Sequence, residues 1–255
     1  MSQSTNISLE GRTALITGGA SGIGVACARA FSRAGATVTV CDQNEQAVKE
    51  LAEETGGGRD YWAVDLSDTK ALEFLTLDVD ILVNNAGIQK VAPIHEFVPD
   101  DWRFIHKLML ESPFLLIRAA LPAMYERGFG RIINISSIHG LRASAFKSAY
   151  VAAKHGLESL SKVTALEGAE YGVTSNCVNP SYVRTALVEK QIKDQAVTHG
   201  IAPEEVVEKI MLTESAIKGL VDADEVASLV TWLASDMAGM VTGASYTVDG
   251  GWTAS

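Results

Sequence analysis

A tyrosine and a lysine spaced four residues apart are the first candidates for chemistry in this chain. They are Tyr150 and Lys154, in a segment that reads SAYVAAK from residue 148 to residue 154. Positions i and i+4 of a helix share a face, so we expect the phenol and the ammonium to project into one cleft. A phenol titrates near pH ~10, and a neighbouring cation stabilises its ionised form. The spacing therefore predicts that Tyr150 acts as a general base near neutral pH, with Lys154 lowering its pKa.

Ser137 precedes this pair by thirteen residues and offers a hydroxyl group to the same cleft. We expect Ser137 to hold a substrate carbonyl or alcohol oxygen against Tyr150, which is a positioning and charge-stabilising role. Taken alone, the spacing of Tyr150 and Lys154 also fits a half-buried tyrosine and a solvated lysine on an ordinary amphipathic helix. The catalytic interpretation therefore depends on the elements that precede this segment.

A glycine-rich turn opens the chain between an apolar run and a helical pattern. Residues 17–24 read TGGASGIG, after the apolar run 14–16 and before the helical pattern 25–31. Glycines at a strand-to-helix junction permit a tight turn and a close approach of the backbone to a pyrophosphate, and the helix N-terminus offers unpaired N–H groups. Gly18, Gly22 and Gly24 therefore predict a dinucleotide-binding site.

Asp42 follows the next strand, which we expect over residues 37–41, about twenty residues after the glycine turn. A carboxylate at this place accepts hydrogen bonds from the ribose hydroxyls of NAD and repels the 2′-phosphate of NADP. The segment 19–21 has no Arg or Lys to offset that repulsion. These features predict NAD as the cofactor. The competing interpretation is that Asp42 caps the helix that begins near Asn44.

Three later strand ends complete the expected cofactor site. Asp65 follows a short strand and faces the adenine in this prediction, and the strand 81–84 runs into the turn 84–87 beside the cofactor's ribose. The strand 173–180 leads to Thr185, which we expect at the nicotinamide carboxamide. The full set of expected cofactor contacts is Gly18, Ser21, Gly22, Ile23, Gly24, Asp42, Asp65, Leu66, Asn85, Ala86, Gly87, Tyr150, Lys154, Pro180, Val183 and Thr185.

With these residues assembled, the chain resembles the short-chain dehydrogenase/reductase family over essentially its whole length. The motifs that carry the resemblance are Gly18-x-x-x-Gly22-x-Gly24, Asn84-Asn85-Ala86-Gly87, Ser137, Tyr150-x-x-x-Lys154 and Val248-Asp249-Gly250-Gly251. The resemblance implies Ser137, Tyr150 and Lys154 as the catalytic residues. It also implies a homotetramer, built through the helices near residues 99–127 and 148–171 and the C-terminal strand.

Two positions depart from the family pattern. Met109 stands where members usually place an Asn that braces a proton-relay water, and Ser181 stands where Gly commonly follows the proline. A thioether is only a weak acceptor, so Met109 anchors a water poorly. The expected catalytic set is therefore a triad.

Within the family, residues 136–156 most resemble the bacterial D-3-hydroxybutyrate dehydrogenases, which interconvert 3-hydroxybutyrate and acetoacetate. The resemblance implies four donors for a small carboxylate, which are Gln89, His139, Lys147 and Gln191. Two of them also follow from position, because Lys147 lies one helical turn before Tyr150 and His139 lies two residues after Ser137. A solvated Lys147 and a structural His139 remain the alternatives. The expected substrate-binding residues are Gln89, Ser137, His139, Lys147, Tyr150 and Gln191.

The composition predicts a single α/β domain over residues 1–255. The chain has 255 residues, of which 47% are hydrophobic, and strand and helix patterns alternate along it. That pattern predicts a doubly wound (Rossmann) parallel sheet with helices on both faces and ligands at the carboxyl ends of the strands. Residues 186–215 hold two helical patterns and are predicted to form a small helical substrate lid. A fixed surface pair of helices is the alternative.

The charge of the chain argues against nucleic-acid and membrane partners, so we expect a small-molecule substrate. The formal net charge is −10, and no basic run or long apolar export segment occurs, which argues against nucleic-acid and membrane binding. Cys27, Cys41 and Cys177 are scattered on apolar segments, as expected for buried thiols in a cytoplasmic protein. The histidines show no metal-ligand spacing, so no metal is expected.

Three other functions remain open at this stage. The first is a dehydrogenase or reductase for a bulkier neutral or aryl secondary alcohol, with a site reshaped by Met109, Ser181 and Tyr182. The second is a catalytically idle NAD-binding sensor, suggested by the missing Asn. The third is a structural interaction module, which leaves the glycine turn unexplained.

Overall fold

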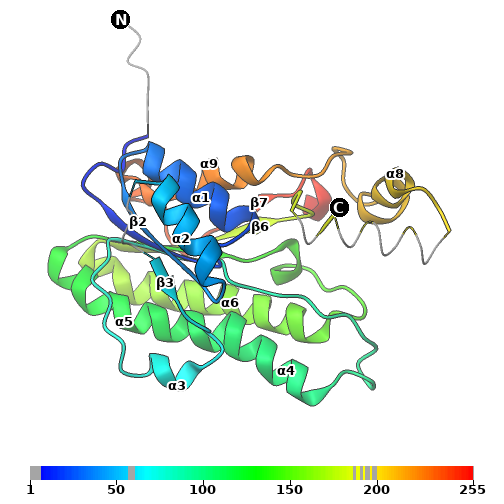
Figure 1. Cartoon of the computed structure of the whole chain (residues 1–255), viewed down its shortest axis with the longest axis horizontal. Coiled ribbons are helices and arrows are strands. Elements are labelled where there is room, and N and C mark those ends of the chain that lie inside the picture. The colour runs from blue at the N-terminus through cyan, green and yellow to red at the C-terminus, as the bar shows by residue number, and fades with distance from the viewer. Residues whose placement is uncertain are drawn as a thin grey trace, which may run out of the picture.

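The computed structural model describes residues 7–56, 61–185, 188, 189, 192, 196 and 200–254. Within these residues, parallel strands form one sheet in the order β3-β2-β1-β4-β5-β6-β7 (Figure 1). The strands are β1 Thr13–Thr17, β2 Thr37–Asp42, β3 Tyr61–Ala63, β4 Ile81–Asn84, β5 Gly130–Ile135, β6 Val173–Pro180 and β7 Ser245–Val248. The order reverses between β1 and β4, so the sheet is doubly wound as the sequence predicts.

The central strands are buried on both faces, including the polar residues that lie among the apolar ones along β6. Every residue of β4, β5 and β6 is buried. Parallel pairing in register aligns Ala14 of β1 with Val38 of β2 on one side and with Ile81 of β4 on the other. The carboxyl ends of these strands therefore lie together along one edge of the sheet.

Helices cover both faces of the sheet (Figure 1). The α-helices are α1 Gly22–Arg33, α2 Glu45–Glu54, α3 Thr69–Leu72, α4 Pro99–His106, α5 Ser112–Arg127, α6 Ser148–Gly168, α8 Pro203–Val206 and α9 Ala223–Ala234. Short 3₁₀ and π turns are η1 Lys107–Glu111, η2 Ile138–Gly140, η3 Ala169–Tyr171, η4 Val207–Met211, η5 Asp236–Ala238 and η6 Trp252–Ala254. Helices α1, α2 and α9 pack on one face, and α3, α5 and α6 pack on the other.

The run Pro99–Arg127 joins α4, η1 and α5 into one long apolar helix. By length and composition alone it could cross a membrane, and half of its most apolar window is buried inside the protein. A core helix has the same composition, and α5 packs Leu115, Leu116 and Ala120 into the interior. The run therefore reads as a helix of the core.

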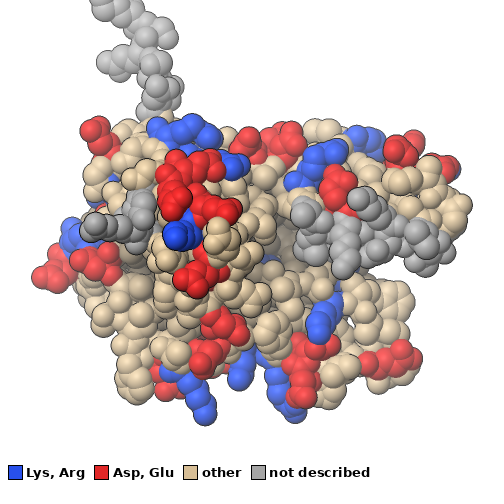
Figure 2. Space-filling view, viewed as in Figure 1, with Lys and Arg blue, Asp and Glu red and all other residues tan. Residues whose placement is uncertain are grey.

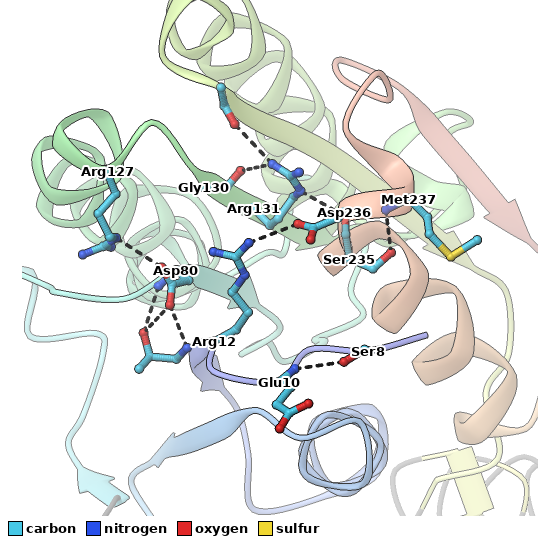
Figure 3. Close-up of polar contacts among 12 residues, drawn as sticks. Ser8, Glu10, Arg12, Asp80, Arg127, Gly130, Arg131, Ser235, Asp236 and Met237 are labelled. Atoms are coloured by element: carbon cyan, nitrogen blue, oxygen red, sulfur yellow. Dashed lines mark hydrogen bonds and ion pairs between the residues drawn. The ribbon is translucent and has the colours of Figure 1, made fainter. Parts of the chain in front are cut away.

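Arginines fix the amino ends of the strands, at the edge opposite the carboxyl ends (Figure 3). The buried guanidinium of Arg131 donates to the carbonyl oxygens of Gly130, Gly172 and Ser235. Arg12 and Arg131 also lie over the ring of Phe129, at 3.5 Å and 4.2 Å from its centroid. These contacts join the start of β5 to the end of α9 and to η3.

Charged side chains on the face shown in Figure 2 form no continuous basic patch, and acidic side chains gather there over α2. The described part of the segment 186–215 includes α8 and η4. It forms a separate apolar cluster in which Val206, Met211 and Leu212 pack with Tyr182. The cluster places this segment next to the strand end that follows β6.

Candidate active site

A pocket of about 330 Å³ opens at the carboxyl ends of the strands. Its walls come from the ends of β1, β2, β4, β5 and β6 and from η1 and α6. The reversal of strand order between β1 and β4 creates a crevice at that point in doubly wound sheets. The fold therefore brings the sequence motifs from both halves of the chain to one cavity.

The glycine turn and the turn after β4 hold each other at the floor of this pocket. The Nδ2 of Asn85 donates to the carbonyl oxygens of Thr17 and Gly18, at 2.9 and 3.0 Å. Gly18 has a φ of +64°, and a Cβ there would lie 2.8 Å from the Cα of Ala86. A Cβ at Gly24 would collide with the carbonyl oxygen of Gly18. Both glycines are therefore required by close backbone packing.

Thr17 holds the turn after β4 beside the pocket, and the sequence reasoning missed this contact. Its Oγ1 accepts hydrogen bonds from the backbone N–H groups of Asn85 and Ala86, at 2.9 and 3.1 Å, and donates to the carbonyl of Val83. A hydroxyl residue at the last position of a strand, directly before the glycines, is the signal that could have identified it.

Asp42 lies in the pocket wall with both carboxylate oxygens oriented by backbone N–H groups. Its Oδ2 accepts from Ala20 at 3.3 Å and its Oδ1 accepts from Asn44 at 3.1 Å. The N-cap of α2 is Asn44, whose Oδ1 accepts from the backbone of Ala47. The interpretation of Asp42 as the helix cap is therefore wrong. Asp65 lies near it in the same wall.

Ser137, Tyr150 and Lys154 come together in the same pocket. Ser137 is hydrogen-bonded to Tyr150, and its Oγ accepts from the backbone N–H of His139 at 3.2 Å. The Nζ of Lys154 donates to the carbonyl of Ile135 at 2.6 Å and lies 5.7 Å from the centre of the Tyr150 ring. The hydroxyl, the phenol and the ammonium thus share one cleft.

The pKa of Tyr150 differs from the expectation. Burial raises it above its usual value, and the hydrogen bond from Ser137 lowers it only in part. Burial also lowers the pKa of Lys154 to about 8, against the opposing effect of Cys177 and Glu158. The ammonium is directed to the Ile135 carbonyl rather than to the phenol oxygen, so desolvation outweighs the effect that the spacing predicts.

Lys147 and His139 form a close pair in the same pocket. The Nζ of Lys147 lies 2.9 Å from the Nε2 of His139. Burial, followed by the charge of Lys147, lowers the pKa of His139 to about 4, so the imidazole is neutral at pH 7 and accepts from the lysine. The Tyr182 ring centroid lies 5.7 Å from the same Nζ, and Trp252 lies edge-on to His139. This part-buried Lys147 does not match the solvated alternative, whereas His139 is buried, as the alternative of a structural histidine also expects.

The remaining predicted residues divide into those that line the pocket and those that do not. The pocket is lined by Gln89 and by Ser21, Gly22, Ile23, Leu66, Ala86, Gly87, Pro180, Val183 and Thr185. Gly24 packs behind the turn and not in the lining. Gln191 lies outside the described residues.

Apolar residues of η1 and its neighbours form a part of the wall that sequence reasoning did not identify. Phe104, Leu108, Ile88 and Val188 line the pocket together with Met109, which is buried in the turn η1. Apolar residues in these segments have the same sequence pattern as residues of the hydrophobic core. The sequence therefore carries no signal that separates the pocket lining from the core. They give the reaction side of the pocket an apolar character.

Comparisons with known proteins match the chain over nearly its full length. A family model described as Enoyl-(Acyl carrier protein) reductase matches residues 18–253. A D-beta-hydroxybutyrate dehydrogenase of Rhizobium meliloti is 45% identical, covering 95% of this chain and 99% of the relative. A second protein of that name, from Cupriavidus necator, is 43% identical, covering 96% and 99%. A putative 2-deoxy-D-gluconate 3-dehydrogenase from Agrobacterium tumefaciens, solved with bound NADP, superposes with a TM-score of 0.87 at 30% identity, covering 98% and 100%.

Proposed function

The chain belongs to the short-chain dehydrogenase/reductase family, and from that premise we propose that it oxidises D-3-hydroxybutyrate to acetoacetate with NAD. The observation that carries the substrate class is the pair of Lys147 and His139, 2.9 Å apart in the reaction side of the pocket. A lysine donor beside a neutral imidazole suits a carboxylate of two oxygens. Two relatives that are 45% and 43% identical over nearly the whole chain are named for the same substrate.

The residues of the glycine turn fit a dinucleotide. Gly18 and Gly24 leave the backbone free of side chains, and Ser21 forms no capping hydrogen bond with the described residues at the start of α1. The first N–H groups of that helix are thus available to a pyrophosphate. A dinucleotide held by these residues would supply the acceptor for the hydride that leaves the substrate carbon.

Side chains of this protein would perform the rest of the reaction. Ser137 and Tyr150 hold the substrate hydroxyl, and Tyr150 takes its proton as the carbon–hydrogen bond breaks. The positive charge of Lys154, 5.7 Å from the centre of the Tyr150 ring, favours the phenolate form, which is the form that can take the proton. Lys147, which is oriented by the accepting Nε2 of His139, holds the carboxylate, and the apolar wall around Met109 excludes water from the reacting carbon.

NAD is the proposed cofactor because Asp42 presents a carboxylate where the adenosine ribose would lie. Its two oxygens are held by the N–H groups of Ala20 and Asn44, so the side chain is fixed in the pocket. A 2′-phosphate would meet that charge without a compensating cation in the segment 19–21. Because one solved relative was found with bound NADP, the preference of this protein for NAD over NADP has to be measured.

A dehydrogenase for a bulkier neutral secondary alcohol is the second candidate. It is favoured by the apolar lining from Phe104, Leu108 and Val188 and by the ring of Tyr182. This candidate keeps the fold, the cofactor and the catalytic residues. It assigns no binding role to the charge of Lys147.

Initial rates of NADH or NADPH formation test the proposal directly. The panel contains D-3-hydroxybutyrate, its L enantiomer and neutral aliphatic and aryl secondary alcohols, each with NAD and with NADP. We expect the highest kcat/KM for the D-hydroxy acid with NAD. Faster oxidation of a neutral alcohol, with the hydroxy acid at background, would replace the proposed substrate by the second candidate.

We also propose that the protein assembles as a homotetramer. The outer faces of α5 and α6 expose Phe114, Val163 and Leu166, and Met240 near the C-terminal strand is 97% exposed. Apolar side chains of this size gain stability when a second copy covers them. Light scattering coupled to size exclusion gives the mass, and a mass of one chain at micromolar concentration contradicts the proposal.

Two further proposals concern the setting of the enzyme. We propose that the segment 186–215 closes over the substrate, supported by the contact of its apolar cluster with Tyr182 of the pocket wall. We propose a cytoplasmic location, supported by Cys27, Cys41 and Cys177, which are buried free thiols.

A further inference from the structure

Glu158 is a buried carboxylate one helical turn beyond Lys154. Tyr150, Lys154 and Glu158 follow one another at i, i+4 and i+8 on α6, so they share a face. Glu158 is buried, with only 5% of its surface exposed. A buried carboxylate is costly unless it is paired and hydrogen-bonded, and an apolar residue of similar volume is often the more stable choice. Its presence behind the catalytic lysine therefore points to a role other than packing.

The carboxylate of Glu158 connects α6 to the turn that carries Ser137. Its Oε1 accepts from the Nδ2 of Asn179 at 2.5 Å, and the same Nδ2 donates to the carbonyl of Ser137 at 2.9 Å. Its Oε2 accepts from the Oγ of Ser245 on β7 at 2.6 Å. One side chain thus joins α6, β6, β7 and the residue that holds the substrate oxygen.

The turn η2 leaves room for this carboxylate by means of a glycine. A Cβ at Gly140 would lie 3.1 Å from the Oε1 of Glu158 and would collide with the Oγ of Ser136. Any larger residue at 140 would push the turn away from α6. The contact between α6 and the Ser137 turn therefore depends both on Glu158 and on the absence of a side chain at Gly140.

The charge of Glu158 also acts on Lys154. Burial lowers the pKa of Lys154 to about 8, and Cys177 and Glu158 raise it against that effect. Tyr150 and Glu158 on α6 and Cys177 on β6 are the titratable groups that face Lys154 among the described residues. β5 presents the Ile135 carbonyl to the ammonium, η1 presents Met109 to the neighbouring Ala153, and His139 of η2 lies edge-on to Tyr150.

We propose that Glu158 is a positioning residue for the hydride transfer, which holds the Ser137 turn against α6 through Asn179 and maintains the positive charge of Lys154 beside Tyr150. The proposal rests on the proposed function only in that Ser137, Tyr150 and Lys154 carry out the reaction. It does not depend on which secondary alcohol is the substrate. All rates are therefore measured with the alcohol of the panel that the wild type oxidises fastest.

The first variant is Glu158→Gln, which removes the charge and preserves the size of the side chain. Its amide oxygen can accept from Asn179, and its NH₂ group can donate to the Oγ of Ser245. Without the carboxylate the pKa of Lys154 falls further, so the alkaline limb of the kcat–pH profile moves to lower pH. A shift of one unit gives about a tenfold loss of kcat at pH 9, because the protonated fraction falls tenfold.

The matched control is Glu167→Gln on the same helix, where the side chain is exposed. It removes the same charge at a place that contacts neither Asn179 nor Lys154 in the hydrogen bonds of the described residues. Its pH profile and its kcat/KM are expected to match those of the wild type. A shared shift in both variants would assign the effect to net charge and overturn the proposal.

The second variant, Asn179→Ala, cuts the link to Ser137 and keeps the charge of Glu158. We expect kcat/KM to fall by about 100-fold, because Ser137 loses the geometry that the reaction needs. The alkaline limb stays in place, and the Kd for the cofactor, measured by fluorescence, stays within about twofold of the wild type because the glycine turn is untouched. This variant is informative even where Glu158→Gln fails to fold.

The outcomes separate the two proposals. If both variants melt at lower temperature while their kcat/KM and pH profiles match the wild type, Glu158 serves stability alone and the inference is overturned. If the wild type oxidises a neutral alcohol and not D-3-hydroxybutyrate, the proposed substrate fails and the test of Glu158 proceeds unchanged. A wild type that oxidises no alcohol of the panel overturns both.

Discussion

The Nζ of Lys147 and the Nε2 of His139 lie 2.9 Å apart, and the imidazole is the neutral partner. Burial lowers the pKa values of both groups, that of His139 to about 4. Lys147 is therefore the donor of the pair, and removing it leaves the substrate site with a neutral ring. Because Lys147 is the charged member of the pair, replacing Lys147 tests whether the site binds a carboxylate.

Replacing Lys147 by Met should weaken binding of a hydroxy acid and spare a neutral alcohol. The lost charge-assisted hydrogen bond is worth ~1.5–3 kcal/mol, so KM for D-3-hydroxybutyrate should rise by about 10- to 100-fold. The value of kcat should change less, because the proposed function places Lys147 at the carboxylate and not at the reacting carbon. Initial-rate kinetics with both substrate types provide the measurement.

Lys162→Met is the matched control for this test, since Lys162 is exposed on the same helix. It should leave both KM values unchanged. An unaltered KM for the hydroxy acid in Lys147→Met would remove Lys147 from the substrate site and favour the neutral-alcohol candidate.

Replacing Asp42 by Ser should shift the cofactor preference toward NADP. The hydroxyl can still accept a hydrogen bond, but the like charge that opposes a 2′-phosphate is gone. We expect the ratio of kcat/KM with NAD to kcat/KM with NADP to fall by about tenfold or more, corresponding to ~1.4 kcal/mol. Glu53→Gln, an exposed residue of α2, controls for the change in net charge. A wild type that already prefers NADP would refute the assignment of Asp42.

Lys154 should make the stability of the protein increase between about pH 8 and pH 10. Its folded-state pKa is lowered from 10.5 to about 8 by burial, so in this range the unfolded chain binds the proton that the folded protein releases. Stability rises with pH wherever the unfolded state binds more protons. Below pH 8 the lysine is charged in both states and contributes no slope.

The measurement is the free energy of unfolding from urea titrations, for the wild type and for Lys154→Met. Buried Cys27 and Cys41, whose pKa values are raised to about 12 by burial, give the opposite slope above pH 9, but they are common to both proteins. The difference, wild type minus variant, should therefore grow from pH 7.5 to pH 9.5. A difference that stays constant would place the pKa of Lys154 near its usual value.

Phe146 should tolerate Gly better than Val. Its φ is +67°, the residue is 58% exposed, and its carbonyl accepts from the N–H of Ala92 at 2.9 Å. The left-handed conformation costs a non-glycine residue ~1–2 kcal/mol, and a β-branched residue more. We expect Phe146→Gly to retain or gain stability by about 1 kcal/mol and Phe146→Val to lose stability, as measured by urea denaturation. The reverse order would show that the aromatic ring, and not the backbone, sets the stability here.

Much of the fold could be predicted from the sequence because its local patterns agree with one another. The glycine turn at residues 17–24, the apolar strands and Tyr150-x-x-x-Lys154 each indicate the same sheet and the same edge of it, and the structure confirms that arrangement. The roles of the site residues stay predictions that the experiments above address.

What the sequence could not provide depends on contacts between distant segments. The tie from Asn85 to the glycine turn and the link from Glu158 to Ser137 join residues that no periodicity relates. The predicted shift of the Tyr150 pKa was wrong in direction, because burial raises this pKa. Residue spacing shows which charges lie near a group, but it does not show how much water burial removes from that group.

The π turn η1 adjusts the phase of one long helix. A helix advances about 100° per residue, so the extra residue in a wide turn rotates every later side chain relative to the earlier ones. The α4 part can thus direct Ile105 toward Ala149 and Ala153 of α6, and the α5 part can direct Leu116 and Ala120 toward the sheet. Deleting a single residue between 107 and 111 would restore a regular helix and turn one of these two faces away from its partner. The number of residues in η1 is therefore fixed by the need to bury both faces.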